Sequence, residues 1–185
     1  MVVDAPLVFT FCADINRFGK WCAQNGAKPC YDNFLWLSTA ITDAVLAAEN
    51  AAVAAEEQGL GICFLGTAMY NAEEIAGVLG LPKGVVPVVA MVAGHPESIP
   101  PTPVLTERLP LEAVVHFEKY RDYTPDSIRK YYSEIESLDK MKAFVAENKV
   151  QNLAELFTKV RYTKESGDLF SKKYLDFVKK SFRIE

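Results

Sequence analysis

One stretch between Trp36 and Gln58 constrains the fold more than any other part of the sequence, because eight alanines lie in it. Its small and apolar residues recur with helical spacing, and its polar side chains fall on the opposite face. Small side chains let another backbone approach closely. The stretch therefore predicts a central helix, inside a domain or across a subunit boundary. The face expected to pack consists of Ile41, Ala44, Val45, Ala48, Ala52 and Ala55.

Three apolar runs of strand length accompany this helix. They are Leu7 to Ala13, Ile62 to Leu65, and Val85 to Ala93, which contains Pro87. Gly59 predicts a left-handed helix stop, and Gly61 a close approach of two backbones. A further helix is expected to start at Asn71 and to end at Gly80. Because strands and helices are mixed in this way, the sequence indicates an α+β fold.

The remaining segments are expected to be a loop, one more extended stretch and a helical tail. Residues 14–35 are interpreted as a long loop. Its aromatic residues Trp21 and Phe34, and Trp36 directly after it, either pack over the core, the favoured reading, or cover a ligand. Val114 to Tyr120 is expected to be extended. Residues 121–185 form the tail, with helices around Ile128–Leu138, Met141–Phe157 and Leu169–Phe182. No boundary is apparent, so residues 1–185 are predicted to form one domain.

Composition excludes several classes of protein. The net charge of −4 argues against a nucleic-acid binder, whose affinity depends on lysine and arginine. The longest apolar run is far shorter than the roughly 20 residues of a membrane span. The first residues lack the pattern of a signal peptide, so we expect a cytoplasmic protein with reduced cysteines. The charge is uneven, with six basic and thirteen acidic side chains in residues 1–120, and fourteen and eleven in residues 121–185.

Cysteine and histidine positions predict no metal site. The four cysteines lack metal-binding spacing, and His95 and His116 lie far apart in the sequence. Cys12 and Cys63 lie in apolar runs and are expected to be core residues. Cys22 and Cys30 lie in the predicted loop, where a reactive thiol is the minor alternative.

Two segments are candidate ligand-binding sites. The turn of residues 66–70 lies between a predicted strand and a predicted helix, where backbone amides can meet a ligand. Arg108 follows a proline-rich segment and could form a forked contact with a phosphate, or pair with its neighbour Glu107. Gly59-Leu-Gly61 follows a helix and precedes a strand, the reverse of a dinucleotide-binding motif. The acidic pairs Glu56/Glu57 and Glu73/Glu74 are expected on solvated helix faces. No catalytic triad can be assembled.

Taken together, short motifs from about residue 4 to residue 120 resemble the FMN-dependent nitroreductase family, in particular its second half. The motifs that carry the resemblance, in chain order, are Asp4-Ala-Pro6, Cys12-Ala-Asp14, Asp43-Ala44, Gly59-Leu-Gly61, Phe64-Leu-Gly66, Leu79-Gly-Leu-Pro82, Gly94-His-Pro96, Arg108-Leu-Pro110 and Val114-Val-His116.

This resemblance implies a nitroreductase-like central mixed β-sheet flanked by helices, with a helical C-terminal tail. It further implies a homodimeric flavoprotein that holds FMN and uses NADH or NADPH to reduce nitroaromatics, quinones or similar acceptors. Phe64, Leu65, Gly66 and Thr67 match the segment that lies against the flavin ring, and Arg108 matches an arginine on the FMN phosphate. Because the flavin carries the electrons, no catalytic acid or base is required of the protein.

The sequence departs from the family pattern at two places. Thr106 stands where the family often has a lysine, and the front segment with its Arg-Ser-x-Arg-like phosphate motif is not found before residue 4. Two alternatives to the reductase therefore stay open. One is a flavin-free, non-catalytic oligomeric form of the same fold, which would arise if the chain is a short form or a piece of a longer protein. The other is an unrelated thiol enzyme that uses Cys22 or Cys30.

Overall fold

The computed structural model describes residues 4–97 and 108–184 and divides into two compact units. The first unit comprises residues Met1–Ile99 together with Asp168–Glu185, and the second comprises Pro100–Gly167. One domain over residues 1–185 stays a prediction.

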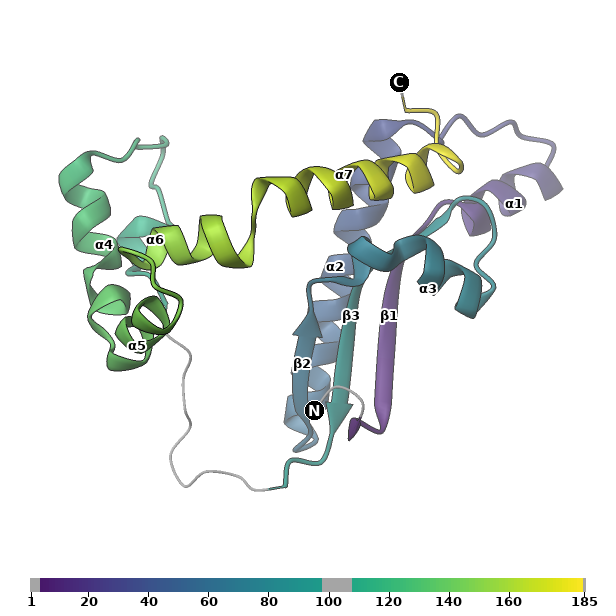
Figure 1. Ribbon diagram of the computed structural model, residues 1–185. Helices are drawn as coiled ribbons and strands as arrows, with labels where there is room; N and C mark the ends of the chain where they lie inside the picture. Colours follow the sequence, from purple (N-terminus) through teal and green to yellow (C-terminus); the bar gives the residue numbers. More distant parts are fainter. Residues whose placement is uncertain (1–3, 98–107, 185) are drawn as a thin grey trace. The chain divides into compact units, whose positions relative to one another are not determined.

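A three-stranded antiparallel sheet with strand order β1-β3-β2 forms the centre of the first unit (Figure 1). Its strands are β1 (Leu7–Asp14), β2 (Gly61–Leu65) and β3 (Val85–Gly94). Each strand begins and ends within one residue of the strand predicted from the sequence. The α+β class is confirmed. The expectation of a mixed sheet is corrected, since every described strand pairing is antiparallel; one isolated parallel bridge joins Asn33 and Arg183.

Pro87 is accommodated in the central strand by an irregularity in its neighbour. Phe11 pairs with Val89 while Cys12 pairs with Pro87, so the register of β1 shifts at this step. The pairing of β2 with β3 covers only Ala90 to Gly94. Pro87, which has no N–H to donate, therefore lies where the central strand has a partner on one side only.

Helices cover both faces of β3. The long helix α2 (Phe34–Glu57) lies behind the sheet in Figure 1, and α3 (Ala72–Leu79), preceded by the short 3₁₀ helix η2 (Ala68–Asn71), lies in front. Almost every residue of β3 is buried, as in a strand that is covered on both sides. The alanine face of α2 is confirmed, with Ala44, Ala48, Ala52 and Ala55 buried. Val45 differs from the prediction and is 47% exposed.

Glycines end two helices as predicted. The α2 helix is followed by Gly59 with φ of 76°, and α3 by Gly80 with φ of 62°, both in the left-handed region that favours glycine. The close approach expected at Gly61 occurs instead at its strand partner Gly94. A Cβ on Gly94 would lie 2.7 Å from Cδ of Pro6, whereas a Cβ on Gly61 would make only ordinary contacts.

The predicted loop of residues 14–35 contains a helix, α1 (Asn16–Gln24), and this expectation was wrong. The backbone N–H of Arg17 donates to Oδ1 of Asp14, which closes the first turn from outside the helix. Trp21 and Phe34 are 59% and 65% exposed, so the expected packing over the core is not observed for these two rings.

The C-terminal helix α7 (Lys164–Lys179) completes the first unit from Asp168 onward. Val178 and Phe182 are buried against Leu37 and Ala44 of α2. Phe170 stacks on Tyr70 of η2 with ring centroids 4.3 Å apart. The exposed carboxylates Glu73 and Glu74, predicted to be simply solvated, pair with Lys180 and Lys173 of the tail.

An ion pair fixes the loop between α1 and α2 to the end of the chain. Nε of Arg183 lies 2.9 Å from Oδ1 of Asp32, and the two segments also form the parallel bridge described above. The Arg183 guanidinium, by its hydrogen bond, holds the pKa of Asp32 below its ordinary value. A carboxyl with a lowered pKa stabilises the folded state above its unfolded pKa, and this stabilisation is lost as the pH falls through the folded pKa.

We therefore expect Asp32→Asn to remove a small, acid-sensitive part of the stability. The melting temperatures of the wild-type protein and the variant should differ near neutral pH, and the difference should shrink only as the pH falls from the ordinary pKa of an aspartate, about 3.9, through the lowered pKa of Asp32 in the folded protein. Thermal unfolding followed by circular dichroism across this pH range tests the expectation. A difference that is unchanged down to pH 3 would contradict it.

The second unit is helical where it is described. It contains the 3₁₀ helix η3 (Leu111–Ala113), α4 (Pro125–Ser137), α5 (Asp139–Glu147), the short α6 (Leu153–Glu155) and a π-helical turn η4 (Leu156–Arg161). Thr124 and Ser127 form a capping box at the start of α4. Two expectations are corrected. Residues 114–120 are irregular, with φ of 65° at Glu118, and the single helix Met141–Phe157 is broken after Glu147, where Lys149 has φ of 55°.

The described helices include none that is both long enough and apolar enough to cross a bilayer.

Candidate functional site

The turn after β2 is the first candidate site, and its residues come from two adjoining elements. Phe64 and Leu65 end the strand, Gly66 and Thr67 form the turn, and η2 follows directly. Phe64 pairs with Met91 of the central strand and keeps 39% of its surface exposed. Gly66 and Thr67 are exposed and Leu65 is half-buried. The predicted strand-to-helix turn is thus present, with an aromatic ring beside it.

The backbone of this turn is open on one side. A Cβ on Gly66 would have no heavy atom within 4 Å, apart from those of its own chain neighbours. Within the described residues, the N–H groups of Gly66 and Thr67 donate to no other residue, while the Thr67 carbonyl accepts from the N–H of Tyr70. Two exposed donors next to an open glycine can meet the electronegative edge of a flat ligand. A flavin ring fits this chemistry.

Arg108 belongs to the second unit and is exposed at the start of its described part. It comes immediately before Leu109 and Pro110, and η3 begins at the next residue. An exposed guanidinium can donate two parallel hydrogen bonds to a phosphate. Glu107, the alternative partner of Arg108, lies outside the described residues. So does Thr106, which stands where the family often has a lysine.

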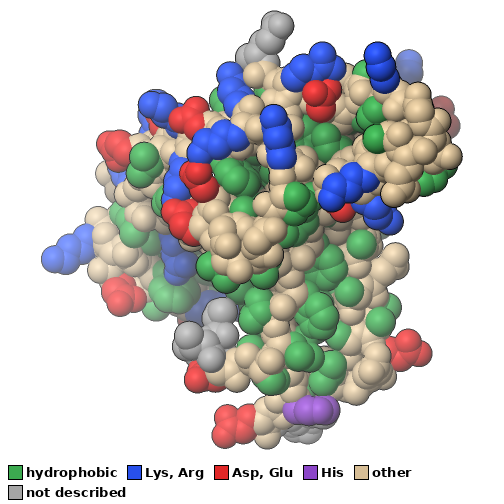
Figure 2. Space-filling view, turned by 90° about the vertical axis from the view of Figure 1, so that its right-hand side faces the viewer, with side chains coloured by type: hydrophobic (Ala, Val, Ile, Leu, Met, Phe, Trp, Pro, Cys, Tyr) green, Lys and Arg blue, Asp and Glu red, His purple; other side chains and the backbone are tan. Residues whose placement is uncertain are grey.

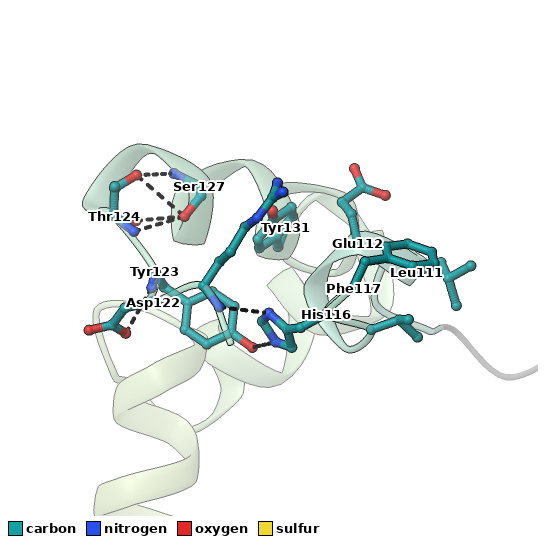
Figure 3. Close-up of a pocket in the computed structure, with 11 residues that line it drawn as sticks. Leu111, Glu112, His116, Phe117, Asp122, Tyr123, Thr124, Ser127 and Tyr131 are labelled. Carbon is teal, nitrogen blue, oxygen red and sulfur yellow. Dashed lines mark hydrogen bonds between the residues drawn. The ribbon is translucent and has the colours of Figure 1, made fainter. Parts of the chain in front are cut away.

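A pocket of about 540 Å³ lies within the second unit (Figure 3). It is formed by η3, the irregular stretch after it and the first turns of α4. Its walls combine aromatic and polar side chains, among them Phe117, Tyr123, Tyr131, His116, Glu112 and Ser127. This pocket was not predicted from the sequence. The signal in the sequence was the cluster of aromatic residues between 116 and 131. Because residues 114–120 were interpreted as an extended stretch, no pocket was expected there.

Hydrogen bonds orient His116 in this pocket. The backbone N–H of Arg121 donates to its Nδ1 at 3.2 Å. The hydroxyl of Tyr123 lies 3.5 Å from Nε2 and donates to the carbonyl of Ala113 at 2.8 Å. His116 is therefore part of a network that connects the irregular stretch to η3 (Figure 3).

Loss of solvent, hydrogen bonding and nearby charges shift the pKa values of two further groups of the second unit. The hydroxyl of Tyr120 loses part of its solvent, and with Tyr123 and Asp122 nearby its pKa is raised. The pKa of Glu112 is lowered by backbone hydrogen bonding and by Lys130, whose Nζ lies 3.2 Å from Oε1 of Glu112. These shifts favour a neutral tyrosine and an ionised glutamate at neutral pH.

The cysteines are placed differently from the prediction. Cys63 is exposed and Cys12 is half-buried, whereas Cys22 of α1 is buried; Cys30 is exposed. Burial, with a further contribution from Asp14, raises the pKa of the Cys12 thiol, so Cys12 is not an activated thiolate. Across residues 4–97 and 108–184 no three histidine, cysteine or acidic side chains are grouped so that they could hold a metal ion.

A three-stranded sheet with a long alanine-faced helix on one side and an open strand-to-helix turn at its end defines an α+β protein. Comparison with known proteins identifies the family. Residues 37–95 match the model of the nitroreductase family. A Bacteroides fragilis NCTC 9343 protein, provisionally described as an oxidoreductase, is 40% identical; its crystal structure has a TM-score of 0.91, and the match covers 96% of this chain and 71% of that chain.

Two proteins of Bacillus subtilis extend the comparison. The FMN reductase (NADPH) of strain 168 is 33% identical over 120 residues, which are 64% of this chain and 47% of the relative. A nitroreductase of known structure is 26% identical with a TM-score of 0.74, covering 94% of this chain and 68% of that chain. The chain spans about half the length of the curated relatives it matches. The chain belongs to the nitroreductase family.

Proposed function

We propose that the chain belongs to an FMN-dependent oxidoreductase that takes electrons from NADH or NADPH and reduces nitroaromatics, quinones or similar acceptors. The open turn at Gly66 and Thr67, in a chain of the nitroreductase family, is the observation that carries this proposal. Relatives named as an NADPH-dependent FMN reductase and an oxygen-insensitive NADPH nitroreductase support the choice of cofactor and reductant. Bound FMN supplies the hydride and electron transfer.

The residues of this chain contribute binding and orientation. Phe64 and Leu65 offer an apolar surface for the flavin ring, and the N–H groups of Gly66 and Thr67 offer hydrogen bonds to its polar edge. We assign the FMN phosphate to Arg108, whose guanidinium is exposed and can form a forked contact. None of these residues has to transfer a proton as a dedicated acid or base.

A homodimer in the cytoplasm is part of the same proposal. Apolar side chains are exposed along β1, the edge strand of the sheet, where Leu7, Val8 and Phe9 retain 46%, 61% and 42% of their surface. Figure 2 shows hydrophobic side chains gathered over the lower part of the face on which this strand lies. Contiguous apolar surface of this kind is typical of association between proteins.

Loading with FMN tests the proposal directly. We expect the purified chain, after incubation with excess FMN and desalting, to retain a visible flavin absorbance band that bleaches when NADPH is added without oxygen. Gly66→Val is expected to abolish this retention, because the new side chain would fill the space over the turn, while the far-ultraviolet circular dichroism stays unchanged. Gly66→Ala should have an intermediate effect.

A flavin-free oligomeric protein of the same fold is the second candidate, and the exposed apolar side chains of β1 favour it. One combined measurement distinguishes the two functions. A stable oligomer by static light scattering that retains no flavin after loading would support the second candidate and contradict the first.

A further inference from the structure

A small pocket in the first unit has the composition of a site for an organic cation. It has a volume of about 270 Å³ and is lined by the end of β1 with the residue that follows it, by α1, by Tyr31 of the connecting segment and by the first turns of α2. The helix α1, the connection and the start of α2 lie at the end of the sheet where β1 leads into α1 (Figure 1). The pocket contains neither the turn at Gly66 nor any residue of the second unit. The lining side chains that carry the argument are Phe18, Tyr31, Trp36, Asp14, Asp43 and Arg17.

Aromatic rings form the walls of this pocket. The rings of Phe18 and Tyr31 have centroids 5.1 Å apart and an angle of 72° between their planes. The rings of Tyr31 and Trp36 are 4.3 Å apart at 84°. Because the planes are nearly perpendicular, these rings do not stack flat on one another. The face of an aromatic ring attracts cations through its quadrupole.

The rings of Phe18, Tyr31 and Trp36 make no cation–π contact with any described residue. Among the described residues, cation–π contacts are found only at Tyr131 and Phe144, both in the second unit. Arg17 lines the pocket, but the cation–π contacts found among the described residues do not include it. Among the described residues, therefore, no cation–π contact at these rings competes with a ligand cation.

Carboxylates give the pocket a net negative charge. Asp14 and Asp43 both line it, and neither is paired with a cationic side chain in the parts of the chain that the structure describes. Asp14 accepts only a backbone hydrogen bond, from the N–H of Arg17. Two carboxylates against one guanidinium leave a net negative charge, which favours a cation over an anion.

Local structure holds the walls in place. Trp36, Ala40 and Asp43 are spaced four and three residues apart on α2 and so lie on one face of that helix. Tyr31 comes from the segment that Arg183 holds through Asp32. Asn33 caps α2 by accepting from the N–H of Trp36 at 3.2 Å. The cage is thus built from two helices and an anchored loop.

We propose that this aromatic pocket binds a small quaternary ammonium or protonated alkylammonium group. Aromatic cages with nearby carboxylates recognise such groups by combining cation–π attraction with charge neutralisation. The small volume restricts the site to a compact head group. This site is separate from the flavin chemistry proposed above, and its test does not depend on FMN.

Titration with choline chloride tests the proposal, with tryptophan fluorescence as the readout. Trp36 lines the pocket and Trp21 contacts Phe18, with ring centroids 5.5 Å apart, so both tryptophans of the chain can report on occupation. We expect a saturable change with choline and none with 3,3-dimethylbutan-1-ol, which has the same shape without the charge. Sodium chloride at equal ionic strength controls for screening.

Variants that change the charge of the pocket test whether it prefers a cation. Asp43→Asn is expected to weaken choline binding about fivefold, and Arg17→Gln to strengthen it. Phe18→Leu, which keeps apolar volume at a 45% exposed position but removes the ring, should weaken binding at least severalfold. Asp176→Asn, on an exposed part of α7, is the matched control and should leave binding unchanged.

Three results would overturn the proposal. They are equal binding of the uncharged analogue, saturable binding of benzoate that is lost in Arg17→Gln, and a linear response to choline with no saturation. The first would indicate an apolar pocket, the second an anion site and the third no site.

Discussion

Replacing Met91 with alanine is expected to lower the free energy of unfolding of the first unit by about 2–5 kcal/mol, as removal of a fully buried side chain does when the surroundings cannot collapse around it. Met91 is completely buried in the central strand, opposite Phe9 of β1 and Phe64 of β2. Because both neighbouring strands are fixed by the ladder, the cavity that alanine leaves cannot be closed by moving one of them. Most of the loss should therefore persist after relaxation.

Urea unfolding followed by tryptophan fluorescence measures this effect in the correct part of the molecule. Both tryptophans, Trp21 and Trp36, lie in the first unit, so the signal follows that unit and not the helices of residues 108–167. Met69→Ala is the matched control, because Met69 lies in η2 with 36% of its surface exposed and should lose less than about 1 kcal/mol. Equal losses in the two variants would contradict the packing described for β3.

The sheet and its main helices could be predicted because local signals and packing agree there. Apolar runs mark all three strands, and Gly59 and Gly80 end helices with the positive φ that a left-handed stop requires. The helix α1 was not predicted, since Arg17, Gly19 and Lys20 interrupt its apolar residues and its cap comes from Asp14 at the end of the preceding strand. The predicted core role of Cys63 failed for a different reason. The strand β2 is a short edge strand, so an apolar neighbourhood in sequence does not ensure burial there.

Candidate sites differ in how far the sequence reveals them. The turn at Gly66 is local, and its position between a strand and a helix can be inferred from neighbouring residues. The pocket around His116 depends on the hydroxyl of Tyr123 returning to Ala113, ten residues away. The aromatic pocket at Trp36 requires Tyr31 to be held by Asp32 and Arg183, which are 151 positions apart. Contacts of that range leave no periodic pattern in the sequence.

Replacing Arg108 with alanine is expected to weaken FMN binding about tenfold to a hundredfold, on the proposal that its guanidinium binds the phosphate. A charge-assisted hydrogen bond to a phosphate is worth about 1.5–3 kcal/mol, which corresponds to this range. Arg108→Lys should recover only part of the affinity, because lysine keeps the charge but cannot form the forked contact. The variants should remain folded, since Arg108 is exposed in a segment without regular structure.

Quenching of FMN fluorescence at fixed ionic strength measures this affinity for each variant. The matched control is Arg129→Ala, which removes another exposed arginine of the second unit, one paired with Asp126 on α4. A loss confined to Arg108 separates a specific phosphate contact from the general effect of removing one positive charge. If Arg108→Ala binds FMN as tightly as the wild type while the wild type retains the flavin, Arg108 has no phosphate role. The assignment of FMN would then depend on the turn at Gly66 and Thr67 alone, where Gly66→Val tests it independently.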